Sequence, residues 1–187
     1  MSTENKNTPE HKDLAVGEVI TNAEHFIEKN QKIILIVIAA ILLVIGGYFG
    51  YKKLYAEPRE ATAAAELFAA EQYFKNDDME KALKGDGKNL GLVAFIDKYG
   101  STKSGNLANF YAGCAYMSKG EFQKAIDFLK DFSAEDAFLG NQSKSLIGDC
   151  YMELNKVDDA INSYNKALEN PNDMPTPFNL FKLVLSY

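Results

Sequence analysis

The chain has 187 residues, of which 47% are hydrophobic and 25% are charged, and its formal net charge is −6. An acidic chain lacks the basic footprint of nucleic-acid-binding proteins, so we expect no nucleic-acid partner. Its two cysteines, Cys114 and Cys150, are too few for a disulfide framework or a paired CxxC metal site.

Residues 1–32 are predicted to form a polar tail followed by a juxtamembrane amphipathic helix. The first 12 residues are polar and are predicted to be disordered. From Leu14 to Ile27 apolar residues recur at helical spacing. An acidic polar face weakens lipid binding, so an interfacial helix, a helix for a soluble partner and a continuation of the next segment all remain open. The acidic residues are Glu18, Glu24 and Glu28.

Residues 33–51, IILIVIAAILLVIGGYFGY, are predicted to form a transmembrane helix. These 19 residues carry no charge, and lysines flank them on both sides. As a helix the segment covers about the 30 Å hydrocarbon core of a bilayer. A cleaved signal peptide is the alternative, but 32 residues precede the segment and no convincing A-x-A site follows it. We therefore expect a retained single-pass anchor.

The charges beside this helix do not decide its orientation. Two basic residues precede it and three follow it, which leans slightly toward a cytoplasmic location for the larger C-terminal part. A long domain, however, can be translocated largely regardless of such charges. The residues counted are Lys29 and Lys32 on one side and Lys52, Lys53 and Arg59 on the other.

An internal repeat follows the apolar segment. The stretch YAGCAYMSKGEFQKAIDFL, residues 111–129, aligns with LIGDCYMELNKVDDAINSY, residues 146–164, at an offset of 35 residues. Each stretch is predicted to form two helices joined by a tight turn, at which Gly or Asn accepts a left-handed conformation. A repeat of this period predicts an all-α solenoid. The aligned pairs are Gly113/Gly148, Tyr116/Tyr151, Gly120/Asn155, Ala125/Ala160 and Ile126/Ile161.

These residues resemble the tetratricopeptide repeat (TPR) family. The second stretch carries the small, aromatic, turn and alanine residues of that pattern, whereas the first has Leu129 and Phe132 where Tyr and Ala are usual. The resemblance implies that Gly113 lets the second helix approach at Ala125. The offset of 35 residues is one longer than the usual TPR period of about 34. We attribute the extra residue to a loop at 138–140. The matching residues are Gly148, Tyr151, Asn155, Ala160, Tyr164 and Ala167.

Residues 52–187 are therefore expected to form a TPR-like domain. We predict copies at about 63–84, 106–137 and 141–172 and a partial copy at 175–187. A half-repeat leaves an apolar face uncovered, which a truncated sequence or a helix from another chain would explain. Between the first two copies GDGKNLG lacks the features of a phosphate-binding loop and is predicted to be a flexible connection.

No catalytic residue, cofactor or metal site is predicted, and we expect no enzymatic activity. Both histidines, His11 and His25, precede the apolar helix, which excludes histidine-based triads and metal sites from the domain. The two cysteines lie in apolar helical patterns, where buried free thiols are expected, although the sequence leaves a bridge open. Acidic pairs are predicted to begin second helices and to cap their N–H groups. These pairs are Asp77/Asp78 and Asp158/Asp159.

The TPR resemblance implies a concave groove lined by the first helix of each copy. Aromatic, methionine and acidic side chains there suit an extended or helical peptide with apolar anchors and some basic residues. The alternative is that Phe110 and Met117 fill the core between repeats. The residues carried over are Glu71, Phe74, Phe110, Cys114, Met117, Gln142, Asp149, Met152 and Glu153.

The order of tail, apolar helix and TPR-like domain is similar to that of the ancillary subunit of the bacterial Sec translocon and to membrane-anchored TPR proteins of the Bacteroidetes type. This resemblance implies a bacterial inner-membrane protein with a periplasmic domain, which scaffolds or assists protein translocation or envelope assembly. The alternative is a structural membrane protein that self-associates. Gly46 and Gly50, a GxxxG spacing, would suit such a homo-oligomer.

Overall fold

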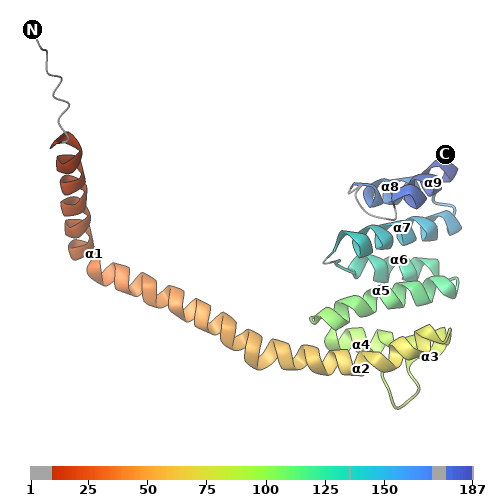
Figure 1. Ribbon diagram of the computed structural model, residues 1–187. Helices are drawn as coiled ribbons and strands as arrows, with labels where there is room; N and C mark the ends of the chain where they lie inside the picture. Colours follow the sequence, from red (N-terminus) through yellow and green to blue (C-terminus); the bar gives the residue numbers. More distant parts are fainter. Residues whose placement is uncertain (1–9, 135, 170–175, 187) are drawn as a thin grey trace, which may run out of the picture. The chain divides into compact units, whose positions relative to one another are not determined.

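The computed structural model describes residues 10–134, 136–169 and 176–186, and it describes side chains within these ranges except for residues 10–28 and 176–180. The chain divides into two compact units, Met1–Leu54 and Tyr55–Tyr187. The described residues form helices and no strand, with one isolated bridge between Gly85 and Leu90 (Figure 1). Residues 1–9 of the tail lie outside the described residues, as do the side chains of the acidic face of the juxtamembrane helix. The predicted disorder is wrong for residues 10–12, which begin helix α1.

The N-terminal unit contains helix α1, Glu10–Tyr51, which leads into a π-helical turn, η1, Lys52–Ala56. The predicted helix at 33–51 is therefore helical, and almost all of its side chains are exposed, Leu43 at 77%. In the described part of the chain, the helical run Lys29–Lys75 is long and apolar enough to cross a membrane, a property that a signal sequence shares. Gly46 and Gly50 face open space, since a Cβ at either position would have no neighbour within 4 Å.

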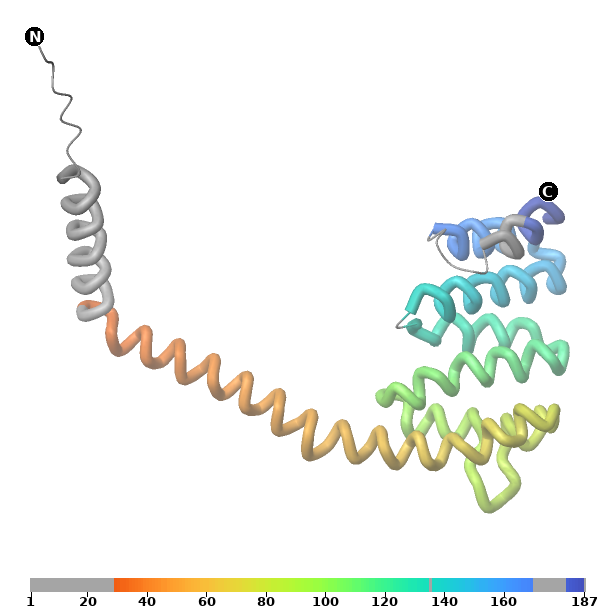
Figure 2. Tube along the Cα trace, in the orientation of Figure 1, coloured from red at the N-terminus to blue at the C-terminus, as the bar shows by residue number. Residues whose placement is uncertain are grey.

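The C-terminal unit is a series of antiparallel helix pairs in which consecutive helices run side by side (Figure 2). This arrangement confirms the predicted helical solenoid. The pairs are α2, Glu57–Lys75, with α3, Met79–Lys84; α5, Lys103–Ser118, with α6, Phe122–Asp131; and α7, Ala137–Glu153, with α8, Val157–Ala167. Helix α9, Thr176–Ser186, follows them, and α4, Leu92–Tyr99, lies between the first two pairs.

The three pairs share one turn geometry. At the turn of each pair one residue adopts a left-handed conformation, with φ of 60° at Asp77, 76° at Gly120 and 56° at Asn155. In each turn a backbone N–H also donates to the carbonyl of the repeat tyrosine, which is Tyr73, Tyr116 or Tyr151, at 2.9 Å. The predicted turn is confirmed in the second and third pairs, and the first pair has the same turn at Asp77. Glycine and asparagine, and here an aspartate, tolerate this backbone region better than other residues.

Gly113 and Gly148 are placed where the two helices of a pair approach most closely. A Cβ on Gly113 would lie 2.5 Å from Cγ of Leu129 and 3.2 Å from the carbonyl oxygen of Ala125. A Cβ on Gly148 would lie 2.4 Å from the ring of Tyr164. Real Cβ atoms do not approach so closely, so each glycine is required by the packing. The interpretation of Gly113 as the close-approach position is confirmed.

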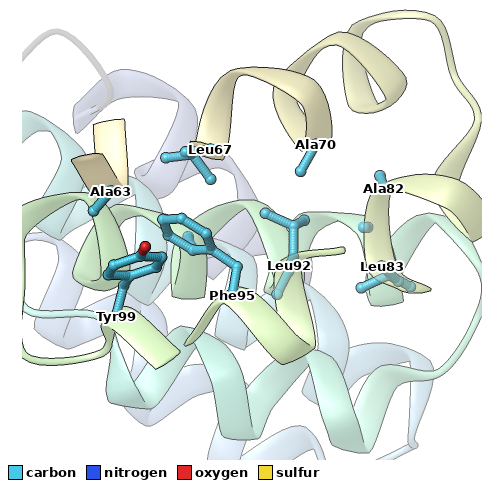
Figure 3. Packing of buried hydrophobic residues seen from close by; sticks show 11 residues of the cluster. Ala63, Leu67, Ala70, Ala82, Leu83, Leu92, Phe95 and Tyr99 are labelled. Atoms are coloured by element: carbon cyan, nitrogen blue, oxygen red, sulfur yellow. The ribbon is translucent and has the colours of Figure 1, made fainter. Parts of the chain in front are cut away.

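The insertion between the first two pairs contains a helix that the sequence did not reveal. Leu92 and Phe95 of α4 are fully buried and Tyr99 is 5% exposed. Figure 3 shows these three side chains directed toward α2, where they meet Ala63 and Leu67. Helix α4 therefore fills the space between the first and second pairs. The repeat tyrosines of these pairs, Tyr73 and Tyr116, are 43 residues apart instead of 35, and the longer spacing accommodates α4.

The GDGKNLG segment before α4 is closed by its own hydrogen bonds. Asp86 accepts hydrogen bonds from the backbone N–H groups of Lys88 and Asn89, at 2.8 and 2.6 Å, and from the hydroxyl of Tyr73, at 2.7 Å. These bonds hold the pKa of Asp86 well below its usual range, with the Asn89 backbone as the largest cause. The segment is a hydrogen-bonded loop attached to α2, and its side chains from Asp86 to Asn89 are exposed.

The position of the loop before the third pair was predicted wrongly. Residues 138–140 lie in α7, which begins at Ala137, and the connection runs from Phe132 to Asp136. The carboxylate of Asp136 accepts a hydrogen bond from the backbone N–H of Leu139 at 2.8 Å and so caps this helix. The side chain of Asn106 holds the connection by accepting from and donating to the backbone of Ser133.

The acidic pairs at the second helices differ in their roles. Asp78 caps α3, because its carboxylate accepts a hydrogen bond from the backbone N–H of Lys81 at 3.1 Å. Asp158 and Asp159 lie in the first turn of α8, whose N-cap, Lys156, makes no side-chain cap. The predicted capping is therefore confirmed for Asp78, and the other pair acts only through its charge near the helix N-terminus.

A carboxylate on α2 caps the N-terminus of α5, which is more than 40 residues further along the chain. Glu60 on α2 accepts hydrogen bonds from the backbone N–H of Lys103, at 2.6 Å, and from the backbone N–H and hydroxyl of Ser104, at 3.0 and 2.6 Å. Lys103 and Ser104 are the first residues of α5, where N–H groups have no partner within the helix. The hydroxyl of their own N-cap, Thr102, accepts from the backbone N–H of Gly105, and Glu60 completes the cap.

Candidate protein-binding groove

An aromatic series connects α2 to α5 among the predicted groove residues. The ring centroids of Phe74 and Tyr111 are 5.3 Å apart, with their planes at 60°. The ring of Tyr111 lies 6.4 Å from that of Phe110, which in turn lies 5.3 Å from that of Phe132. All four side chains are half-buried. The structure therefore brings Phe74 and Phe110 into one series through a third ring.

Tyr111 is the member of this aromatic series that sequence reasoning missed. It occupies the position between Phe74 and Phe110, yet the positions carried over from the TPR pattern did not include it. Burial raises its pKa, and the negative charge of Glu71 raises it further. The consecutive aromatic residues at 110 and 111 were the available signal in the sequence. Glu71 therefore supplies the negative charge beside this series, and Tyr111 supplies a neutral phenol.

Phe110 and Met117 also contact the core. Both are half-buried and pack against the second core cluster, which includes Ile126 and Cys150. Phe74 packs in the same way against the first cluster. These contacts support the alternative that such side chains fill space between repeats, while their exposed parts remain at the surface. Their contribution to ligand binding stays a prediction.

The two cysteines are free thiols. Cys150 is fully buried, and burial raises its pKa to about 12. Cys114 is half-buried in the predicted groove, and burial raises its pKa to about 11. A thiol with a raised pKa is a poor nucleophile at neutral pH. Neither cysteine therefore supplies reactive chemistry to this surface.

The predicted residues of the third pair are divided between internal contacts and the surface. The carboxylate of Asp149 accepts a hydrogen bond from the hydroxyl of Tyr164 at 2.8 Å and forms a salt bridge with Lys182 of α9 at 2.5 Å. Both partners of the salt bridge are mostly buried, at 18% and 21% side-chain exposure. Asp149 is thus used within the domain. Gln142 and Met152 are half-buried and Glu153 is exposed.

A pocket of about 590 Å³ lies at the connection between α6 and α7, outside the predicted groove residues. Its floor is formed by core side chains such as Leu129 and Ile147, and two lysines line it. Both lysines have partners in the domain: Lys130 donates to the hydroxyl of Tyr151 at 2.8 Å and Lys144 to the carbonyl of Lys166 at 3.1 Å. None of the predicted groove residues lines this pocket, but Phe132, whose ring packs against that of Phe110, does.

The arrangement offers a surface for binding and no assembled reaction centre among the described residues. In that part of the chain there is no group of three or more His, Cys, Asp or Glu side chains that could hold a metal ion. The domain sequence contains no histidine. The first helices present a set of half-buried aromatic and methionine side chains beside a carboxylate, and aromatic and methionine side chains are enriched in protein interfaces in general.

Comparison with known proteins gives one family. Residues 142–173 match the model of the tetratricopeptide repeat. No curated protein matches the chain. The matched segment contains most of α7 and all of α8, and the preceding pair shares its turn and its close-approach glycine. The match identifies a tetratricopeptide repeat at α7 and α8, a repeat that typically serves in non-enzymatic protein-interaction modules.

Proposed function

We propose that the protein is a membrane-anchored interaction module. In this proposal residues 33–51 cross the membrane once, and the domain from residue 52 onward binds a peptide segment of a partner protein along α2, α5 and α7. The match to the tetratricopeptide repeat supports protein binding. The exposed apolar side chains of α1 support the anchor, because such a surface in water would be costly.

The aromatic series formed by Phe74, Tyr111 and Phe110 is the observation that carries the proposal. Aromatic side chains dominate the energetics of protein interfaces because they bury much area with few rotatable bonds. The series lies beside Glu71, and Phe110 and Met117 pack against the same core cluster, so the surface suits a ligand with apolar side chains and a basic residue. The predicted residues Gln142, Met152 and Glu153 extend it along α7.

The proposed partners are proteins that cross or assemble at the bacterial inner membrane. The order of tail, apolar helix and TPR-like domain supports this, through its similarity to the ancillary subunit of the Sec translocon and to Bacteroidetes-type membrane TPR proteins. We place the domain on the periplasmic side. An anchor keeps the groove close to emerging chains and so raises its effective concentration for them.

Site-specific photo-crosslinking of the full-length protein in native membranes tests this proposal. A benzophenone amino acid is placed at Glu71 or Met117 in the groove, and at Gln123, an exposed residue of α6, as the matched control. We expect a discrete adduct with a partner protein from the groove positions and none from Gln123. Tyr111→Ala should weaken capture about tenfold or more. Adducts that form equally at all three positions, or none, would overturn the proposal.

Self-association is the second candidate function, and one observation favours it. Helix α9 exposes a row of large apolar side chains, Phe181 at 59%, Val184 at 71% and Leu185 at 67%. A second copy could cover this face. Val184→Lys with Leu185→Glu should then convert an oligomer into a monomer in analytical ultracentrifugation. A protein that is monomeric at high concentration before substitution would remove this candidate.

A further inference from the structure

The two ends of the apolar helix carry different chemistry. At the C-terminal end Tyr48, Phe49 and Tyr51 fall within four residues and are 62%, 63% and 61% exposed. The exposed side chains of Lys52 and Lys53 follow immediately. At the N-terminal end the flanking sequence is KNQK, residues 29–32, and residues 27–47 contain no aromatic side chain. The nearest aromatic residue on that side is Phe26.

Aromatic and lysine side chains restrict the depth of a helix to different degrees. Tyrosine rings prefer the boundary between acyl chains and headgroups, because one end of the ring is apolar and the other is polar. A lysine can extend its long side chain toward the interface from a range of depths. An end that carries only lysines can therefore slide, whereas an end with several rings resists sliding in both directions. Lysines beside the rings add attraction to anionic headgroups.

We propose that Tyr48, Phe49, Tyr51, Lys52 and Lys53 form an interfacial collar that fixes the C-terminal end of the span at the headgroup level of an anionic bilayer. Differences in bilayer thickness are then taken up at the other end, around Lys29 and Lys32. This inference rests on the proposed membrane anchoring. It adds that the chain leaves the bilayer at a constant depth on the side of Leu54, whatever the thickness of the membrane.

The sequence offers a direct measurement, because the chain contains no tryptophan. Single-tryptophan variants of the full-length protein, Tyr51→Trp, Ile33→Trp and Leu42→Trp, are reconstituted in vesicles of phosphatidylcholine and phosphatidylglycerol. Their depths are measured by quenching with lipids brominated at different positions. The bilayers are chosen to be thinner and thicker than the roughly 30 Å core of a typical membrane. The same indole is placed at both ends, so its own interfacial preference cannot create a difference between them.

We expect the tryptophan at position 51 to stay at the interface in every bilayer and the one at position 33 to change depth with thickness. Equal shifts at the two ends, or a larger shift at position 51, would overturn the collar. A tryptophan at position 42 that is not quenched by deeply brominated lipids would show that the segment does not span. That result would overturn the anchoring itself, so the two failures are distinguishable.

A collar-deficient variant separates the side chains from the helix that carries them. Tyr48→Leu, Phe49→Leu, Lys52→Gln and Lys53→Gln are combined with Tyr51→Trp, which leaves the length of the apolar segment unchanged. We expect position 51 then to shift with bilayer thickness as position 33 does. If it remains fixed, the collar residues are not the cause and the proposal is wrong. Far-UV circular dichroism of the same vesicles verifies that the variant is still helical.

Discussion

The α5–α6 and α7–α8 pairs share a turn conformation and a close-approach glycine, but the side chain that packs against the glycine differs. In both, a glycine of the first helix faces a side chain of the second, and a left-handed residue makes the turn. That side chain is Leu129 in one pair and Tyr164 in the other. The tyrosine fills the place of the leucine, and its hydroxyl donates to Asp149, which also pairs with Lys182. The repeat thus determines where a side chain must pack, and the choice of side chain determines what else it connects.

The largest effect is expected from replacing Leu129, the side chain that packs against the glycine in the α5–α6 pair. Leu129 is 1% exposed and lies in the second core cluster. Leu129→Ala removes its packing and leaves a cavity against Gly113, so we expect a loss of about 2–5 kcal/mol in the free energy of unfolding. Urea unfolding followed by circular dichroism measures it. Val157→Ala, at an exposed position, is the control. A loss below about 1 kcal/mol would mean that the site collapses without cost.

Replacing Gly113 and replacing Gly148 should cost different amounts of stability, because the side chains that they face differ in rigidity. Gly148→Ala and Gly113→Ala each place a Cβ in a site without room, which we expect to cost about 1–3 kcal/mol. The ring of Tyr164 is held by Asp149, whereas Leu129 can change rotamer, so the cost should be larger at Gly148. Thermal unfolding of the two variants compares them. Tyr164→Leu should partly rescue Gly148→Ala, and an absence of rescue would contradict the assigned contact.

Tyr164→Phe isolates the polar connection of the third pair. The ring is kept and one hydrogen bond to Asp149 is lost, so we expect a cost of about 0.5–1.5 kcal/mol. Hydrogen exchange in α9 should also accelerate, since Asp149 positions Lys182. Tyr116→Phe is the control, because the ring of Tyr116 stacks on Phe128 at 5.3 Å. If the rate of hydrogen exchange in α9 does not change, the hydrogen bond between Tyr164 and Asp149 does not contribute to the docking of α9.

The smallest effect is expected at an exposed ionic contact of the first pair. Glu80 on α3 pairs with Lys119 at the end of α5 and with Lys84, and these hydrogen bonds lower its pKa from 4.5 to about 2. A lowered pKa contributes stability that is present above about pH 4.5 and is lost as the pH falls toward 2. Glu80→Gln should therefore lower the melting temperature slightly at neutral pH.

The pH dependence provides the control for Glu80. The melting temperatures of the variant and the original protein should converge as the pH falls below about 2, where the carboxylate is protonated in both states. Asp97→Asn, at an exposed position of α4, should show no such convergence. High salt should also reduce the difference at neutral pH, because the contact is exposed. If the difference in melting temperature between Glu80→Gln and the original protein does not depend on pH, packing and not charge causes it.

The sequence predicted those features that depend on local spacing. The offset of 35 residues identified both the glycines and the turns, because each is a property of the backbone that few residues satisfy. Helix α4 escaped detection because it is only eight residues long and shows no repeat. The start of α7 was misplaced because the capping role of Asp136 was not recognised.

The candidate groove was less predictable than the fold. Phe74 and Phe110 were identified from the family pattern, yet Tyr111 connects them through packing between α2 and α5, which no local pattern reports. Asp149 was expected at the groove, but its oxygens are engaged by Tyr164 and by Lys182. Lys182 is 33 residues further along the chain, and such a pairing depends on how α9 docks. Long-range contacts of this kind are set by tertiary structure.

The cap that Glu60 places on α5 has a consequence for the order in which the solenoid unfolds. Repeat arrays are stabilised mainly between neighbours, and their terminal elements fray first. Three charge-assisted hydrogen bonds, donated by Lys103 and Ser104 to Glu60, join α2 to the start of α5. Opening α2 would uncap α5 at the same moment, so these two helices should melt together. Fraying is then expected to begin at α9 and to proceed toward α2, which leaves the part nearest the apolar helix folded longest.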